Sequence, residues 1–283
     1  MKKTIITFCA LSMAMTMISC GNSNSSNNTT NENAETIKAE NQNAITVHNG
    51  KEFLEAIKSD AHIIIDCNKP IEVDNIDVNL TESYDYEETG IFKTGDIALR
   101  ISNINNLTIE GKSKENAIFT SKNPNVDILT FYNCKNLNLK NLTIKHSEHG
   151  FVENSRINGL TLICAANTAI DNCNINCNDI AISNDNGVIT ITNCDIFDNE
   201  ECGICIGITG NTLIKDSKIH NNYMPFMISG LETATTFEKC DIIDNSDAPY
   251  MEGSANFLNC KVEDKISDKE NAVIIDCNIV KSE

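Results

Sequence analysis

A six-residue unit with apolar residues at its first and sixth positions and a small residue at its fourth recurs through the second half of the chain. Its copies start at Ile170, Ile191, Ile214, Phe237, Phe257 and Ile274. Successive starts therefore lie 21, 23, 23, 20 and 17 residues apart, and two earlier units, which begin at Ile101 and Phe131, lie 30 residues apart. A recurrence near 22 residues is too short for helical-pair repeats and is typical of a coil of short strands. The pattern predicts that residues 45–283 form one domain of stacked strands, with longer loops on the first coils.

The segment before these coils has a helical pattern. Asn49 and Glu52 are spaced as in a capping box, and Phe53, Leu54 and Ile57 give one apolar face. We expect an amphipathic helix of about ten residues here. Such a helix would cover the open end of the first coil.

The third position of the unit is Asn or Asp in five of the six copies, and Lys239 in the other. Asn and Asp tolerate the left-handed backbone that a corner between two strands needs. We therefore expect this position to form the corner, with positions one, four and six pointing inward. A second set of asparagines follows three residues after the sixth position, where we expect them to stack as an amide ladder. These residues are Asn178, Asn199, Asn222 and Asn245.

The fourth position is cysteine in most copies of the unit. The residues concerned are Cys173, Cys194, Cys240, Cys260 and Cys277. Neighbouring coils lie about 4.8 Å apart, which a disulfide can span, but a small, soft side chain also stacks well in a narrow corner. We favour stacked free thiols, and the disulfide state stays open. Cys202 and Cys205 form a C-x-x-C motif without a second pair or a nearby His at zinc spacing, so no metal or cofactor is predicted.

Composition narrows the classes of partner. The chain has 283 residues, a formal net charge of −18, no Trp and 5% aromatic residues. This charge excludes a nucleic-acid backbone as a partner, because such binders need a basic face. It also argues against docking on anionic lipid by charge alone. Few aromatic rings are available to stack on sugars.

Residues 1–20 resemble the signal peptide of bacterial lipoproteins. Two lysines at positions 2 and 3 precede an apolar stretch, residues 5–17, that is too short to span a bilayer. The sequence Met-Ile-Ser-Cys-Gly that follows resembles the lipobox of that class, with Met17 where the motif usually carries Leu. The resemblance implies cleavage, acylation of Cys20 by a fatty acid such as palmitate, and export to a bacterial membrane, on its periplasmic or cell-surface side. An ordinary secretory signal is the alternative.

Residues 21–44 are polar, rich in Asn and Ser, and without strand or helix periodicity. Such a composition predicts a flexible tether, because it cannot bury enough apolar surface to become ordered. The expected partners are the membrane, through lipid on Cys20, and a polysaccharide or an envelope protein.

The coil units are similar to those of right-handed parallel β-helix repeat proteins of the pectin-lyase-like class. Residues 97–111 and 127–144 resemble the opening coils of that class, and the N-terminal helix resembles its cap. The resemblance covers residues 45–283 and implies an all-β fold, a single right-handed parallel β-helix with a short N-terminal capping helix. It says little about activity, since this fold carries lyases, hydrolases, adhesins and proteins without known chemistry.

One polar cluster is a candidate acid–base or metal site. It comprises His146, Glu148, His149, Glu153 and Arg156, in a loop after a predicted strand. A solvated loop is the alternative, and it is the one we favour.

The motifs of the enzymes in this class are poorly matched. Their hydrolases carry Asn-Thr-Asp, a pair of Asp and Gly-His-Gly in that order. Here Ser-Asn-Asp-Asn-Gly at residues 183–187 is only distantly similar to the first, and no Asp pair follows. The Arg-x-Pro-x-x-Arg stretch of many pectate lyases is absent.

The strand before each unit gives a second argument against catalysis. We expect its inward column to be Ile180, Ile204, Phe226 and Tyr250, and its outward column to be Ala181, Cys205, Met227 and Met251. Such an outward face lacks the charges that an acid-polysaccharide lyase needs. The sequence therefore favours a lipid-anchored envelope protein that binds or scaffolds without catalysis. A polysaccharide lyase or glycoside hydrolase is the alternative.

Overall fold

The computed structural model describes residues 44–75, 96–147, 157–207, 211–231, 233–267 and 269–282. The chain divides into two compact units, Met1–Glu40 and Asn41–Glu283, and all described residues belong to the second. The predicted signal peptide, Cys20 and nearly all of the tether lie outside the described residues. Within them, no helix is long and apolar enough to cross a membrane.

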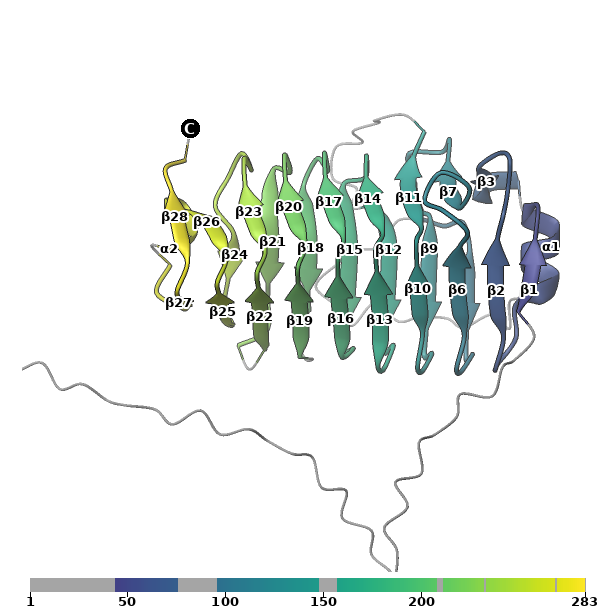
Figure 1. Ribbon diagram of the computed structural model, residues 1–283, viewed down its shortest axis with the longest axis horizontal. Helices are drawn as coiled ribbons and strands as arrows, with labels where there is room; N and C mark the ends of the chain where they lie inside the picture. The colour runs from purple at the N-terminus through teal and green to yellow at the C-terminus, as the bar shows by residue number, and fades with distance from the viewer. Residues whose placement is uncertain are drawn as a thin grey trace, which may run out of the picture. The chain divides into compact units, whose positions relative to one another are not determined.

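Three parallel sheets make up the described domain, and the chain visits them in turn, once per coil (Figure 1). The first sheet contains β1 (Ile45–Val47), β2 (His62–Ile65), β6 (Thr108–Gly111), β10 (Asn138–Lys140), β13 (Thr168–Asp171), β16 (Ile189–Thr192), β19 (Thr212–Lys215), β22 (Ala234–Glu238), β25 (Ser254–Leu258) and β27 (Ala272–Ile275). The second contains β3 (Ile71–Glu72), β7 (Ile118–Ser121), β11 (Thr143–His146), β14 (Asn174–Asn176), β17 (Asp195–Phe197), β20 (Lys218–His220), β23 (Asp241–Ile243), β26 (Lys261–Glu263) and β28 (Asn278–Val280). The third contains β5 (Arg100–Ser102), β9 (Leu129–Tyr132), β12 (Asn158–Ile163), β15 (Ile180–Asp185), β18 (Cys202–Ile206), β21 (Met224–Ile228) and β24 (Tyr250–Met251). A short pair, β4 (Asp96–Ile97) and β8 (Val126–Asp127), completes the strands of the described residues.

The corners between the first and second sheets form at the predicted position. Asn172, Asn193 and Asp216 have φ angles of 51°, 54° and 49°, and Lys239 adopts the same conformation with φ 54°. Lysine has no intrinsic preference for this backbone, so the neighbouring coils must impose it. The corner repeat is therefore confirmed, including the copy whose sequence departs from it.

The cysteines of the fourth position stack above one another, as predicted. The amide of Cys173 donates to Sγ of Cys194 at 3.4 Å, and the amide of Cys194 donates to Oγ of Ser217 at 3.1 Å. Each side chain thus accepts a hydrogen bond from the coil before it. All described cysteines are free thiols, and the thiol of Cys173, together with burial, raises the pKa of Cys194. The column is a packing device of small side chains that also satisfy backbone amides.

The predicted amide ladder is present and buried in the turns from the second to the third sheet. Nδ2 of Asn199 donates to Oδ1 of Asn222 at 2.7 Å, and the same contact links Asn178 to Asn199 at 3.3 Å and Asn222 to Asn245 at 3.1 Å. Lys265 occupies the next equivalent position, where its ammonium donates to the carbonyl oxygen of Asn245. The lysine ends the series because its side chain has no acceptor to offer a further coil.

The two ends of the domain are covered differently. α1 (Gly50–Ala56) begins after Asn49, whose Oδ1 accepts from the amide of Glu52 at 3.0 Å, and it is shorter than predicted. Its Phe53 is buried and packs edge-on against Phe119, so the helix closes the first coil, as expected (Figure 1). At the other end α2 (Asp264–Ser267), which the pattern did not predict, precedes the last coil, and Ile279 there is 49% exposed.

In the third sheet, the prediction of which side chains point inward is partly wrong. Ile180 pairs with Cys202 rather than with Ile204, and it lies in a separate cluster outside the main core. Ile182 takes the expected place beside Ile204, and Ala181 belongs to the main core. The strands do not alternate strictly at this point, so counting by two along the sequence gives the wrong face.

The predicted facing is also wrong at the C-terminal end of the same sheet. Tyr250 pairs with Met227 and is exposed, whereas Met251 packs against the core. These two residues exchange the faces that the sequence predicted for them. Cys205 is confirmed on the outer face, but it is buried there with Ile180 and Cys202.

Candidate functional site

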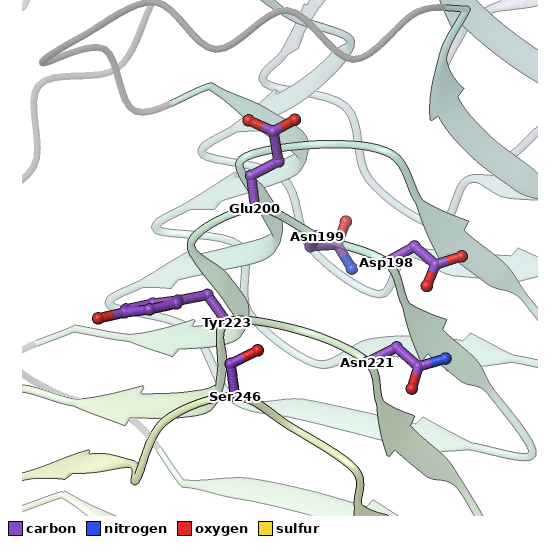
Figure 2. Close-up of a pocket in the computed structure, with 6 residues that line it drawn as sticks. All are labelled: Asp198, Asn199, Glu200, Asn221, Tyr223 and Ser246. Carbon is purple, nitrogen blue, oxygen red and sulfur yellow. The ribbon is translucent and has the colours of Figure 1, made fainter.

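A groove crosses three stacked turns that connect the second sheet to the third. We name it the corner groove. It has a volume of about 500 Å³ and is lined by Asp198, Asn199, Glu200, Asn221, Tyr223 and Ser246. Figure 2 shows Asp198 and Asn221 on one side of the turns and Tyr223 on the other. The groove is therefore bordered by polar groups on one side and by an aromatic ring on the other.

The turns hold these side chains in a fixed order. Asp198 and Asn221 both have a φ of 54°, which reverses the chain after β17 and β20 and turns their side chains outward. The next residue in each turn is a ladder asparagine, which points inward. The residue after it is Glu200, Tyr223 or Ser246 on successive coils. The groove is thus a product of the coil repeat.

Backbone hydrogen bonds continue between the coils through these turns. The amides of Glu200, Tyr223 and Ser246 donate to the carbonyl oxygens of the ladder residues one coil back, at 2.9, 3.1 and 2.9 Å. Because each turn is bonded to the previous one, the stack of coils fixes the backbone positions that carry the lining side chains. The backbone of the groove is therefore preorganised before any ligand arrives.

Four of the lining side chains are available to a ligand. Asp198, Asn221 and Ser246 are exposed, and Tyr223 is 49% exposed. Within the described part of the chain, these four side chains make no hydrogen bond or ion pair. They offer a carboxylate, an amide, two hydroxyl groups and an aromatic ring.

A buried carboxyl group lies beside the groove, one coil toward the N-terminus. Burial, and to a smaller extent the carboxylates of Glu200, Glu201 and Asp127, raise the pKa of Asp179 to about 7, against the hydrogen bond from the Ile157 amide. That amide donates to Oδ2 of Asp179 at 3.2 Å. At neutral pH this carboxyl is therefore protonated in a large fraction of molecules.

Of the polar cluster that the sequence predicts, only His146 lies among the described residues. His146 is 5% exposed, with Nδ1 2.8 Å from Oδ1 of Asn178 and Nε2 3.0 Å from the carbonyl oxygen of Val126. It stands at the start of the amide ladder and has no free ring nitrogen. Glu148, His149, Glu153 and Arg156 lie outside the described residues, and their proposed role stays a prediction.

The sequence pattern did not predict the corner groove. Its exposed residues can be found by aligning the turns on the ladder asparagines, since Asp198 and Asn221 precede them and Tyr223 follows one. Nothing in the pattern distinguishes these positions from other polar turns. Among the described residues, no group of three or more His, Cys, Asp or Glu is arranged to hold a metal ion.

Comparison with known proteins identifies the family. The family model described as "Right handed beta helix region" matches residues 127–282. The chain belongs to this right-handed β-helix family. Among solved structures, this β-helix protein resembles the pectin methylesterase from Yersinia enterocolitica, with 11% sequence identity and a TM-score of 0.34 over 67% of this chain and 84% of that one. The comparison with curated proteins found no match.

Proposed function

We propose that this β-helix protein is anchored by lipid in the bacterial envelope and binds a carbohydrate in the corner groove, without catalysis of its own. The observation that carries the proposal is the set of four side chains without described partners in a rigid groove, namely Asp198, Asn221, Tyr223 and Ser246. The signal-like sequence that ends at Cys20 supports the anchor. The function is therefore recognition at a distance from a membrane.

The chemistry of the groove favours a carbohydrate over a protein partner. A carboxylate and an amide each present two atoms that hydrogen-bond to neighbouring sugar hydroxyls. An exposed tyrosine ring adds an apolar face. The centre of a protein–protein interface is instead depleted of charged residues, and none of the six described lining residues is aliphatic.

Replacing Tyr223 by alanine is expected to weaken carbohydrate binding about tenfold, because the ring supplies the main apolar contact. The measurement is isothermal titration of the full-length protein, in detergent micelles, with tetrasaccharides of glucose and of N-acetylglucosamine. Tyr250→Ala is the matched control, since Tyr250 is also half-exposed but lies outside the groove. Equal loss in both variants, or no binding by the unaltered protein, would contradict the proposal.

The anchor is tested separately. Cells fed a clickable palmitate analogue should label the unaltered protein and not the Cys20→Ala variant, because only the lipobox cysteine is acylated after export. Cys9→Ala is the control, since Cys9 lies inside the predicted signal. A Cys20→Ala protein that still carries label would exclude lipidation at this residue.

A glycoside hydrolase or polysaccharide lyase is the second candidate. It is favoured by Asp179, a buried carboxyl group with a pKa of about 7, since glycosidases use one protonated carboxyl group together with an ionised one. Release of shorter oligosaccharides from the same tetrasaccharides or from acidic ones, lost in Asp179→Asn, would support it. If the oligosaccharides remain intact after long incubation, catalysis is excluded for these substrates and binding remains the proposed function.

A further inference from the structure

The charge of the corner groove restricts its ligand further than its shape does. Of the six described lining residues, two are carboxylates and none is basic. Asp198 is exposed and has no described partner. Asp244 takes the equivalent corner two coils further on, with φ 57°, and it is exposed as well. Two carboxylates thus flank the exposed amide of Asn221 along one edge of the turns.

The buried part of the same corner adds to this negative charge. The carboxylates of Glu200, Glu201 and Asp127 act on Asp179, which keeps its proton up to near neutral pH. Among the described residues of this corner, the imidazole of His146 is engaged by Asn178 and Val126. The corner therefore brings several carboxyl groups close together. An approaching anion would add to this repulsion, and a cation would relieve it.

We propose that the carbohydrate bound in the corner groove carries a protonated amine, as an amino sugar does, with its ammonium group at Asp198. This inference rests on the proposed function and specifies its ligand class. The exposed ring of Tyr223, on the opposite side of the turns, contacts an apolar face of the sugar. The formal net charge of −18 attracts such a ligand and repels a uronic-acid polymer.

The test compares three tetrasaccharides that differ in charge: glucosamine, N-acetylglucosamine and galacturonic acid. Each is titrated into the full-length protein in detergent micelles. At low ionic strength, the glucosamine oligomer is expected to bind about fivefold more tightly than its N-acetyl form, the scale of an exposed ion pair. The galacturonic acid oligomer is expected to bind most weakly. The glucosamine preference should vanish near 1 M salt, where the screening length falls to about 3 Å.

Asp198→Asn is expected to remove most of this preference, so that the variant binds the glucosamine and N-acetyl oligomers with similar affinity. Asp216→Asn is the matched control. Asp216 is an exposed corner residue with φ 49°, but it lies at the other end of the second-sheet strands, at the corner with the first sheet. An equal effect of the control would show a response to net charge alone and would overturn the assignment to the groove.

Three further outcomes separate this inference from the proposed function. If N-acetylglucosamine binds as tightly as glucosamine, the amine preference is wrong and carbohydrate binding stands. If no oligomer binds, the proposed function fails and the inference fails with it. Tightest binding by the galacturonic acid oligomer would overturn the inference alone.

Discussion

Replacing Asn199 by alanine is expected to lower the free energy of unfolding by about 4 kcal/mol. Its Nδ2 donates to Oδ1 of Asn222 at 2.7 Å and to the carbonyl oxygen of Phe197 at 3.0 Å, and its Oδ1 accepts from the amide of Asn178 at 3.2 Å. Alanine leaves all three of these partners without this contact, and water replaces little of the loss because Asn199 is only 2% exposed. The measurement is a urea titration followed by circular dichroism.

The control for this variant lies in a second amide ladder, on the surface. Asn136 donates to Oδ1 of Asn106 at 2.8 Å and accepts from Asn167 at 3.2 Å, and all three side chains are exposed. Glycine adopts the φ of 55° at this corner without strain. Asn136→Gly should therefore cost less than about 1 kcal/mol, because water replaces the lost bonds. Similar costs in the two variants would show that burial does not give the inner ladder its stability.

The repeat explains why the architecture could be predicted from the sequence. At each corner the same backbone conformation is required on every coil, so Asn172, Asn193 and Asp216 repeat a preference that no single residue would establish. The exception, Lys239, follows its neighbours without altering the pattern. The stacked cysteines and the inner ladder were predictable for the same reason, since a residue buried between equivalent positions is constrained from both sides.

The facing of the third sheet could not be predicted in this way. Strands of this sheet contain two to six residues, and only part of each pairs in register. Ile180 and Ile182 are both apolar and two residues apart, yet they lie in different clusters. Hydrophobicity alone does not show where the alternation breaks, because a buried outer cluster looks like core in the sequence.

The candidate site was less predictable than the fold. Asp198 and Tyr223 are 25 residues apart in the sequence, and they border one groove only because their turns stack one coil apart. His146 shows the reverse. Its sequence neighbours are polar, which favoured a solvated loop over an acid–base or metal site, but its ring is buried at the start of the ladder. Exposure of a turn residue depends on the coils beside it, which local sequence does not record.

Replacing Asp179 by asparagine is expected to raise the free energy of unfolding by about 2 kcal/mol at pH 8. The pKa of Asp179 is about 7 in the folded protein and about 3.9 in an unfolded chain. Between these values the folded state binds the extra proton, so the stability due to this group is lost as the pH rises through that window. The shift of roughly three pKa units corresponds to at most about 4 kcal/mol, which residual solvent access reduces. Asparagine is neutral and can still accept from the Ile157 amide.

The gain must disappear near pH 3, where Asp179 is protonated in both states, and this pH dependence distinguishes removal of a buried charge from better packing. Asp66→Asn provides a control of opposite sign. The hydrogen bond from Lys112 and that from Asn116 lower the pKa of Asp66, so its ionised form stabilises the fold above the unfolded pKa, and that stability is lost as the pH falls. Urea titrations of both variants from pH 3 to pH 8 should therefore diverge in opposite directions from the unaltered protein. A gain in Asp179→Asn that is constant with pH would mean that its carboxyl group ionises as freely in the folded turn as in water.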